Sequence, residues 1–163
     1  RIDTLGRPAP GNPGGTAVYA SGLTDPQGMC AGPDGSAWVT DRAAGRDVLH
    51  RVAPGTLPAP AWTWHDRPGV AGCSVNAGVL VVALTGTKSI FALRPGENGT
   101  FTGDPQTLLV DAYGRLSAAA PGPDGLLWLG TTNKDGGAGA TPKASDDRVI
   151  RIQPPTGGGA SRA

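Results

Sequence analysis

The sequence has little that would serve a nucleic-acid-binding, membrane-spanning or helical protein. Its 14 basic and 13 acidic residues nearly balance, and no basic stretch is interleaved with aromatic residues as a nucleic-acid surface requires. No apolar run approaches the roughly 20 residues that cross a bilayer. No window of about ten residues keeps apolar side chains at i, i+3 and i+4 without an intervening Gly or Pro, so we expect essentially no helix.

The start of the chain is also informative by what it lacks. The sequence begins at Arg1, without an initiator Met and without a signal peptide. We interpret this start as that of a processed, cut or partial product. We therefore take no prediction of localisation from the N-terminus itself.

Glycine and proline, in contrast, are abundant. The 27 glycines and 16 prolines make up about a quarter of the chain, a level that raises the question of disorder. They fall between apolar runs and not within them, which argues against disorder. The runs are short, rich in β-branched residues, Leu or Trp, and bounded by turn residues, as is typical of strands. They are Val79–Leu84, Ser89–Leu93, Leu126–Gly130 and Arg148–Ile152.

One pattern occurs twice in clear form and once in degenerate form. Residues 31–42 read AGPDGSAWVTDR before DVLHRV, and residues 121–132 read PGPDGLLWLGTT before DRVIRI. Between them, SVNAGVLVVALTGT precedes KSIFAL. The turn glycines Gly35, Gly78 and Gly125 are 43 and 47 residues apart. A period of about 40 to 50 residues with several short strands is typical of β-propeller blades. The alternative, a β-sandwich, would make the similarity of these hairpins fortuitous.

We therefore predict an all-β fold, a β-propeller of which about three four-stranded blades are present, half of a six-bladed ring. The blades are expected at 22–68, 69–111 and 112–153, after the end of an earlier blade, with 154–163 as a flexible Gly/Ser-rich tail. Three blades leave the first and last faces open. The expected partner is the N-terminal half of the same propeller, on the same or a clipped chain.

The two cysteines, Cys30 and Cys73, each lie five residues before the turn glycine of their blade. Equivalent positions on neighbouring blades near the axis come close enough for a disulfide. We predict a Cys30–Cys73 bridge formed in an oxidising compartment, with two buried free thiols as the alternative. No metal site is expected, because no further His or Cys is spaced to complete one. His50 and His65 each stand alone, so no catalytic residue is assigned.

Two segments carry a resemblance to a known family. PAPGNP at Pro8–Pro13 precedes DPQG at Asp25–Gly28, and the C-terminal part reads YGRLSAAAPGPDGLLWLGTTNKDG before DDRVIRI. In this combination the chain resembles the C-terminal half of the glucose/sorbosone dehydrogenase family. The segment WTWHDRPGVAGC (Trp62–Cys73) is similar to actinobacterial LppZ-type envelope lipoproteins. The resemblance implies an extracytoplasmic protein, secreted or membrane-anchored through an upstream lipoprotein segment.

The enzymes of this family are soluble six-bladed quinoproteins that oxidise aldose sugars. They hold pyrroloquinoline quinone (PQQ) and calcium near the axis and use a His base on an early blade, a region that this chain does not contain. The resemblance implies four cofactor-binding residues if the quinone site functions. They are Asp25, Gln27, Lys88 and Arg115.

The expected quinone ligands are incompletely matched. Thr24-Asp25 stands where the family has Arg-Asn before P-Q-G, and Thr85 stands near an expected Lys. Ser117 replaces the second of two arginines, and TDRAAGRD at Thr40–Asp47 replaces an acidic, glycine-rich calcium-binding stretch. Each charge-assisted contact contributes about 1.5–3 kcal/mol. We therefore expect the quinone site to be degenerate.

These observations favour a non-catalytic propeller of the cell envelope that binds a ligand or scaffolds an assembly, with no cofactor. An envelope protein or a sugar is the expected partner besides the other half of the ring, and no nucleic acid is expected. The alternative is a fragment of a PQQ-dependent aldose sugar dehydrogenase, an oxidoreductase that needs PQQ and calcium. A third interpretation, a lactonase-like hydrolytic propeller, lacks a recognisable set of metal-binding Glu, Asn and Asp residues.

Overall fold

A computed structural model describes residues 1–156. Within these residues there are thirteen strands, two short 3₁₀ turns, η1 (Pro13–Gly15) and η2 (Glu97–Gly99), and no α-helix. No helix in this part of the chain could therefore cross a membrane. Most of the predicted tail at 154–163 lies outside the described residues.

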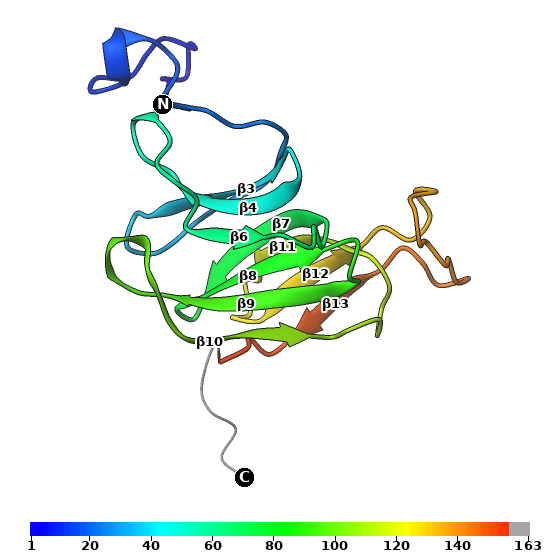
Figure 1. Cartoon of the computed structure of the whole chain (residues 1–163). Coiled ribbons are helices and arrows are strands. Elements are labelled where there is room, and N and C mark those ends of the chain that lie inside the picture. Colours follow the sequence, from blue (N-terminus) through cyan, green and yellow to red (C-terminus); the bar gives the residue numbers. More distant parts are fainter. Residues whose placement is uncertain (157–163) are drawn as a thin grey trace.

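Three antiparallel sheets follow one another along the chain and stack face to face (Figure 1). Blade 1 consists of β2 (Pro26–Ala31), β3 (Ala37–Ala43), β4 (Arg46–Arg51) and β6 (Trp62–Trp64). Blade 2 consists of β7 (Val70–Asn76), β8 (Val79–Leu84), β9 (Ser89–Pro95) and β10 (Phe101–Leu108). Blade 3 consists of β11 (Leu116–Pro121), β12 (Leu127–Thr131) and β13 (Val149–Ile152). This meander of strands in stacked sheets is the β-propeller architecture that the repeat predicts.

Two departures from the expected blades stand out. Blade 3 has three strands within the described residues, so β13 pairs on one side only. The short strand β1 (Ala20–Ser21) precedes blade 1, and the short strand β5 (Gly55–Thr56) lies in the connection between β4 and β6. These two strands form a separate parallel pair. Ile2, expected at the end of an earlier blade, makes only an isolated bridge to Pro8.

The hydrophobic core consists of two layers, one on each face of blade 2. Strand β8 is buried along its whole length and its side chains alternate between the layers. Leu80, Val82 and Leu84 pack toward blade 1, and Val79, Val81 and Ala83 pack toward blade 3. A strand that is buried on both faces reads as a continuous apolar run, because neither face is left for polar residues.

The inner strands β2, β7 and β11 lie against one another near the axis. A Cβ atom added to Gly28 would lie 2.7 Å from the carbonyl oxygen of Ala71, and one added to Gly72 would lie 2.9 Å from that of Ser117. Only glycine allows two backbones to approach so closely. Between blades 1 and 2 this contact is reinforced by the predicted Cys30–Cys73 disulfide, whose Cα atoms are 5.6 Å apart. The disulfide prediction is thus confirmed.

Candidate anion site at the axis

A shallow cavity of about 370 Å³ lies at the end of the blades where β3 and β8 finish and β7 and β11 begin. Three arginines from three different segments line it together with Asp47, Gly69 and Thr85: Arg42 near the end of β3, Arg67 before β7 and Arg115 before β11. The convergence follows from the propeller topology, which brings equivalent strand ends of all blades to one face.

Arg42 and Asp47, from the β3–β4 hairpin, hold the start of blade 2 in place. The Arg42 guanidinium donates to the carbonyl oxygen of Val70 at 3.0 Å and to the Thr85 hydroxyl at 3.3 Å. The Asp47 carboxylate accepts the backbone N–H groups of Gly69 at 2.7 Å and Val70 at 3.0 Å. Both side chains therefore face the cavity with part of their hydrogen-bonding capacity already used.

Arg115 is fixed by the long loop between β12 and β13. Its guanidinium donates to the carbonyl oxygens of Thr132 and Ala138 and forms an ion pair with Asp135 at 2.9 Å. The pKa of the Asp135 carboxyl lies below its ordinary value, first because the backbone N–H of Gly137 donates to it, and further through the Thr132 hydroxyl and Arg115. At neutral pH this carboxylate stays ionised and offsets the charge of Arg115.

Arg67 differs from the other two arginines. It is exposed, its φ is +51°, and its side chain has no hydrogen-bond partner among residues 1–156. The three guanidinium groups are thus opposed by two carboxylates, those of Asp47 and Asp135. One positive charge remains unopposed at the mouth of the cavity.

Of the four residues that the resemblance implies for a quinone site, the structure places Arg115 in the lining of this cavity. The other three lie outside the lining. Lys88 forms an ion pair with Asp111 at 3.3 Å. Gln27 donates to the carbonyl oxygen of Asp25 at 3.2 Å, and the backbone N–H of Asp25 donates to the Asp41 carboxylate at 2.6 Å. Their role as cofactor ligands stays a prediction.

Sequence reasoning missed Arg42 and Arg67. The repeat did contain a signal for Arg42, because Arg42, Thr85 and Thr132 each lie seven residues after the turn glycine of their blade. Residues at one repeat position at a strand end gather around the axis, so the register alone places Arg42 beside Thr85. Arg67 lies in an irregular loop, for which the repeat gives no register.

The remaining polar residues singled out in the sequence have structural surroundings. His50 is buried and His65 is exposed. Asp147 accepts the Thr131 hydroxyl at 3.2 Å, and Asp146 pairs with Arg148 at 2.8 Å, both just before β13. Within the described residues, no group of three or more His, Cys, Asp and Glu lies together as a metal site would need.

Comparison with solved structures gives the same architecture. The PQQ-bound aldose sugar dehydrogenase from Streptomyces coelicolor is 27% identical, with a TM-score of 0.81, over 93% of this chain and 50% of that one. The putative oxidoreductase (glucose dehydrogenase) from Thermus thermophilus is 29% identical, with a TM-score of 0.77, over 88% and 50%. This chain has the fold of the PQQ-type sugar dehydrogenases.

A third solved structure is similar to this chain in its fold only. The soluble aldose sugar dehydrogenase from Escherichia coli, in its apo form, is 20% identical with a TM-score of 0.64 over 76% of this chain and 48% of that one. The chain thus spans about half the length of the solved structures it matches. No family model and no curated protein matches the sequence.

Proposed function

We propose that this chain belongs to a non-catalytic, extracytoplasmic β-propeller of the glucose/sorbosone dehydrogenase type, which binds a small ligand with a single acidic group in the axis cavity. The observation that carries the proposal is the charge of this cavity. Three arginines face two carboxylates, and only Arg67 has a free guanidinium among the described residues of the cavity. A site with one unopposed positive charge suits a monoanion.

PQQ fits these residues poorly. It is a planar trianion, and each carboxylate that leaves water needs a cation or several donors of its own. Arg42 and Arg115 are held by main-chain carbonyls, and Arg115 also by Asp135. Asp25, which stands where the family has Asn, adds a carboxylate just before β2. We therefore derive no redox chemistry from the cavity.

Calorimetric titration of the protein as it purifies tests this proposal. We expect gluconate to bind more tightly than glucose and Arg67→Ala to weaken gluconate binding about tenfold, the loss of one charge-assisted contact. Arg46→Ala is the matched control, since Arg46 is an exposed arginine of the adjacent hairpin that does not line the cavity. Equal binding of gluconate and glucose would contradict the proposal.

A fragment of a PQQ-dependent aldose sugar dehydrogenase is the second candidate. It is favoured by the likeness to the PQQ-bound Streptomyces enzyme and by the presence of Arg115 in the cavity. With PQQ, calcium and glucose added to the protein joined to its N-terminal half, we expect dye reduction at the background rate. Reduction well above background would place this candidate first.

The location and partner belong to the same proposal. The Cys30–Cys73 disulfide supports an oxidising, extracytoplasmic compartment, because disulfides persist there. The resemblance to LppZ-type envelope lipoproteins supports anchoring at the cell envelope. The unfinished blade 3 supports an N-terminal half that completes the ring. Co-purification of the two halves after separate expression would test this pairing, and two halves that stay apart would contradict it.

A further inference from the structure

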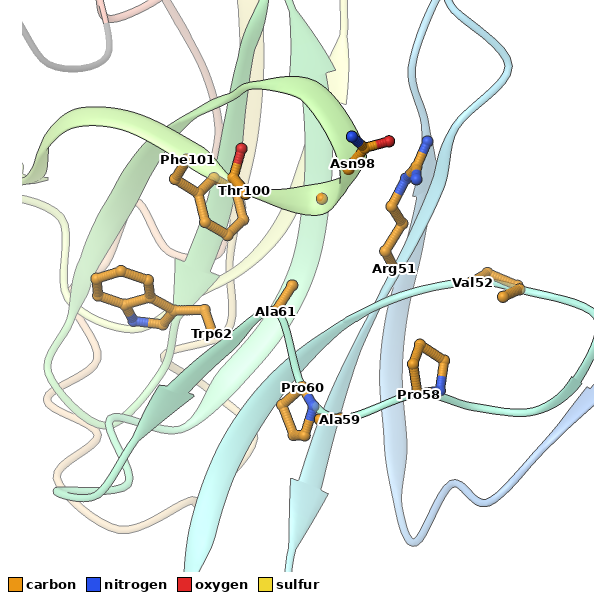
Figure 2. Close-up of a pocket in the computed structure, with 12 residues that line it drawn as sticks. Arg51, Val52, Pro58, Ala59, Pro60, Ala61, Trp62, Asn98, Thr100 and Phe101 are labelled. Atoms are coloured by element: carbon orange, nitrogen blue, oxygen red, sulfur yellow. The ribbon is translucent and has the colours of Figure 1, made fainter.

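A second, larger pocket lies at the opposite end of β4 from the axis cavity (Figure 2). Its volume is about 580 Å³, within the usual range for small-molecule sites. Three segments form it: the end of β4 with the two residues after it (Arg51–Ala53), the proline-rich stretch Pro58–Trp62, which leads into β6, and the tip of the β9–β10 hairpin around Asn98. The pocket thus lies between the outer strands of blades 1 and 2.

The walls of this pocket combine aromatic surface with free polar groups. Trp62 and Phe101 meet edge to face with their ring centroids 6.0 Å apart. Figure 2 shows Arg51 and Asn98 on the other side of the opening, both directed toward its rim. Neither the Arg51 guanidinium nor the Asn98 amide has a hydrogen-bond partner within residues 1–156.

The repeat supplies an internal control for Arg51. Arg51 is paired with Trp38 across the sheet, just as Arg151 is paired with Trp128 in blade 3. Arg151 uses its charge internally, in an ion pair with Asp124 at 3.2 Å. Arg51 lies instead along the hairpin of blade 2, where a Cβ added to Gly99 would be 3.1 Å from its Cδ atom. Its guanidinium remains close enough to Asp34, the equivalent aspartate of blade 1, to lower the pKa of that carboxyl, but within the described residues it forms no ion pair with Asp34 and it lines the pocket.

We infer that this pocket binds a ring-shaped ligand that carries one carboxylate, of the hexuronic acid type. Arg51 pairs with the carboxylate in the bidentate manner that guanidinium groups favour. The Asn98 amide bonds to a ring hydroxyl, and Trp62 and Phe101 cover the apolar face of the ring. This site is separate from the axis cavity, so the inference does not rest on the function proposed there.

The test is titration of the protein as it purifies with glucuronate, glucose and benzoate, followed by NMR of the Trp62 indole N–H, with the signal assigned by Trp62→Phe. Glucuronate is expected to shift this signal at the lowest concentration. Glucose lacks the carboxylate that Arg51 would bind, and benzoate lacks the ring hydroxyls that Asn98 would bind. Each of these two ligands therefore tests one of the two contacts. A shift by benzoate equal to that by glucuronate would overturn the sugar class, and no shift by any of the three would overturn the site.

Variants separate this site from the axis cavity. Arg51→Gln keeps the aliphatic stem over Gly99 and is expected to weaken glucuronate binding about tenfold or more. Asn98→Asp, which tolerates the positive φ of this turn, adds a repelling charge and should act in the same direction. Arg151→Gln, the matched control, and Arg67→Ala in the axis cavity should leave the Trp62 signal and its response unchanged. Equal losses in Arg51→Gln and Arg151→Gln would overturn the inference.

Discussion

Trp38 in blade 1 and Trp128 in blade 3 occupy the same position of the repeat but have different surroundings. Trp38 is 1% exposed and packs on Phe101 of blade 2 with ring centroids 5.5 Å apart. Trp128 is half-buried, lies under the Arg151 guanidinium and donates to the Asp124 carboxylate at 3.0 Å. The strand sequence therefore sets the direction of the side chain, while the next blade sets its burial. Within the described residues, no further blade covers this face of blade 3.

The largest expected effect comes from truncating Trp38, the tryptophan that the next blade covers. Trp38→Ala should lower the free energy of unfolding by about 3–5 kcal/mol, because it opens a cavity between two blades. Trp128→Ala should lower it by about 1 kcal/mol or less, since the ring lies on an open face. Urea denaturation of both variants measures the difference. Equal losses would show that the two faces are equally covered.

The two joints between blades differ in the same direction. Blades 1 and 2 are joined by the Cys30–Cys73 disulfide, whereas Ala120 of blade 3 stands at the position equivalent to these cysteines. Replacing both cysteines by Ala should lower the free energy of unfolding by about 2–4 kcal/mol. Mass spectrometry without reductant should show the two cysteine-containing peptides linked. Free thiols on both would contradict the bridge.

The open face of blade 3 should also promote association. Apolar surface gains about 25 cal/mol per Å² when it is buried, and Val149 on this blade is 72% exposed. We expect residues 1–163 alone to self-associate and Trp128→Glu to weaken that association about tenfold, about 1.4 kcal/mol. Light scattering measures both. A well-folded monomer with a cooperative melt would contradict the idea that this face is made for a partner.

The smallest expected effect concerns two equivalent turn aspartates. The pKa of Asp124 lies below its ordinary value mainly because the Trp128 indole N–H donates to it, whereas that of Asp34 is lowered mainly by the Ser36 hydroxyl. Both contribute stability above the ordinary Asp pKa of about 4 and lose it as the pH falls through the lowered value. Trp128→Phe should raise the pKa of Asp124 and leave that of Asp34 unchanged in a carboxyl NMR titration. A shift of both would mean that the fold itself has changed.

Most of the fold could be predicted because the repeat constrains it at several levels at once. Gly35, Gly78 and Gly125 have φ values between +73° and +79°, which tight hairpin turns require and glycine readily adopts. The glycines that revealed the period in the sequence are therefore the residues that the turns need. The alternation of Leu80 and Val81 between two cores follows from strand geometry alone. The three-stranded form of blade 3 was not predicted, since the sequence repeat marks three strands in each copy and carries no motif for a fourth.

The site was less predictable, and for a physical reason. Arg42 and Arg115 are 73 positions apart in sequence and meet only because blades close around an axis. Lys88 lies at the same end of the molecule, yet its partner is Asp111. Which of several long cationic side chains turns toward a cavity depends on loop carboxylates nearby, and loops carry no periodic signal.

The glycine contacts of the inner strands have a consequence for how the ring closes. Gly28 and Gly72 set the thickness of each wedge at its thin edge, where a Cβ would press on the next backbone. A wedge that is thickened at its thin edge tapers less, so it spans a smaller angle around the axis. In a closed ring the angles of all wedges must add to one full turn, so an error at one joint is shared by all the others. The glycines near the axis therefore help to fix the angle between neighbouring blades, and with it the number of blades that a closed ring can hold.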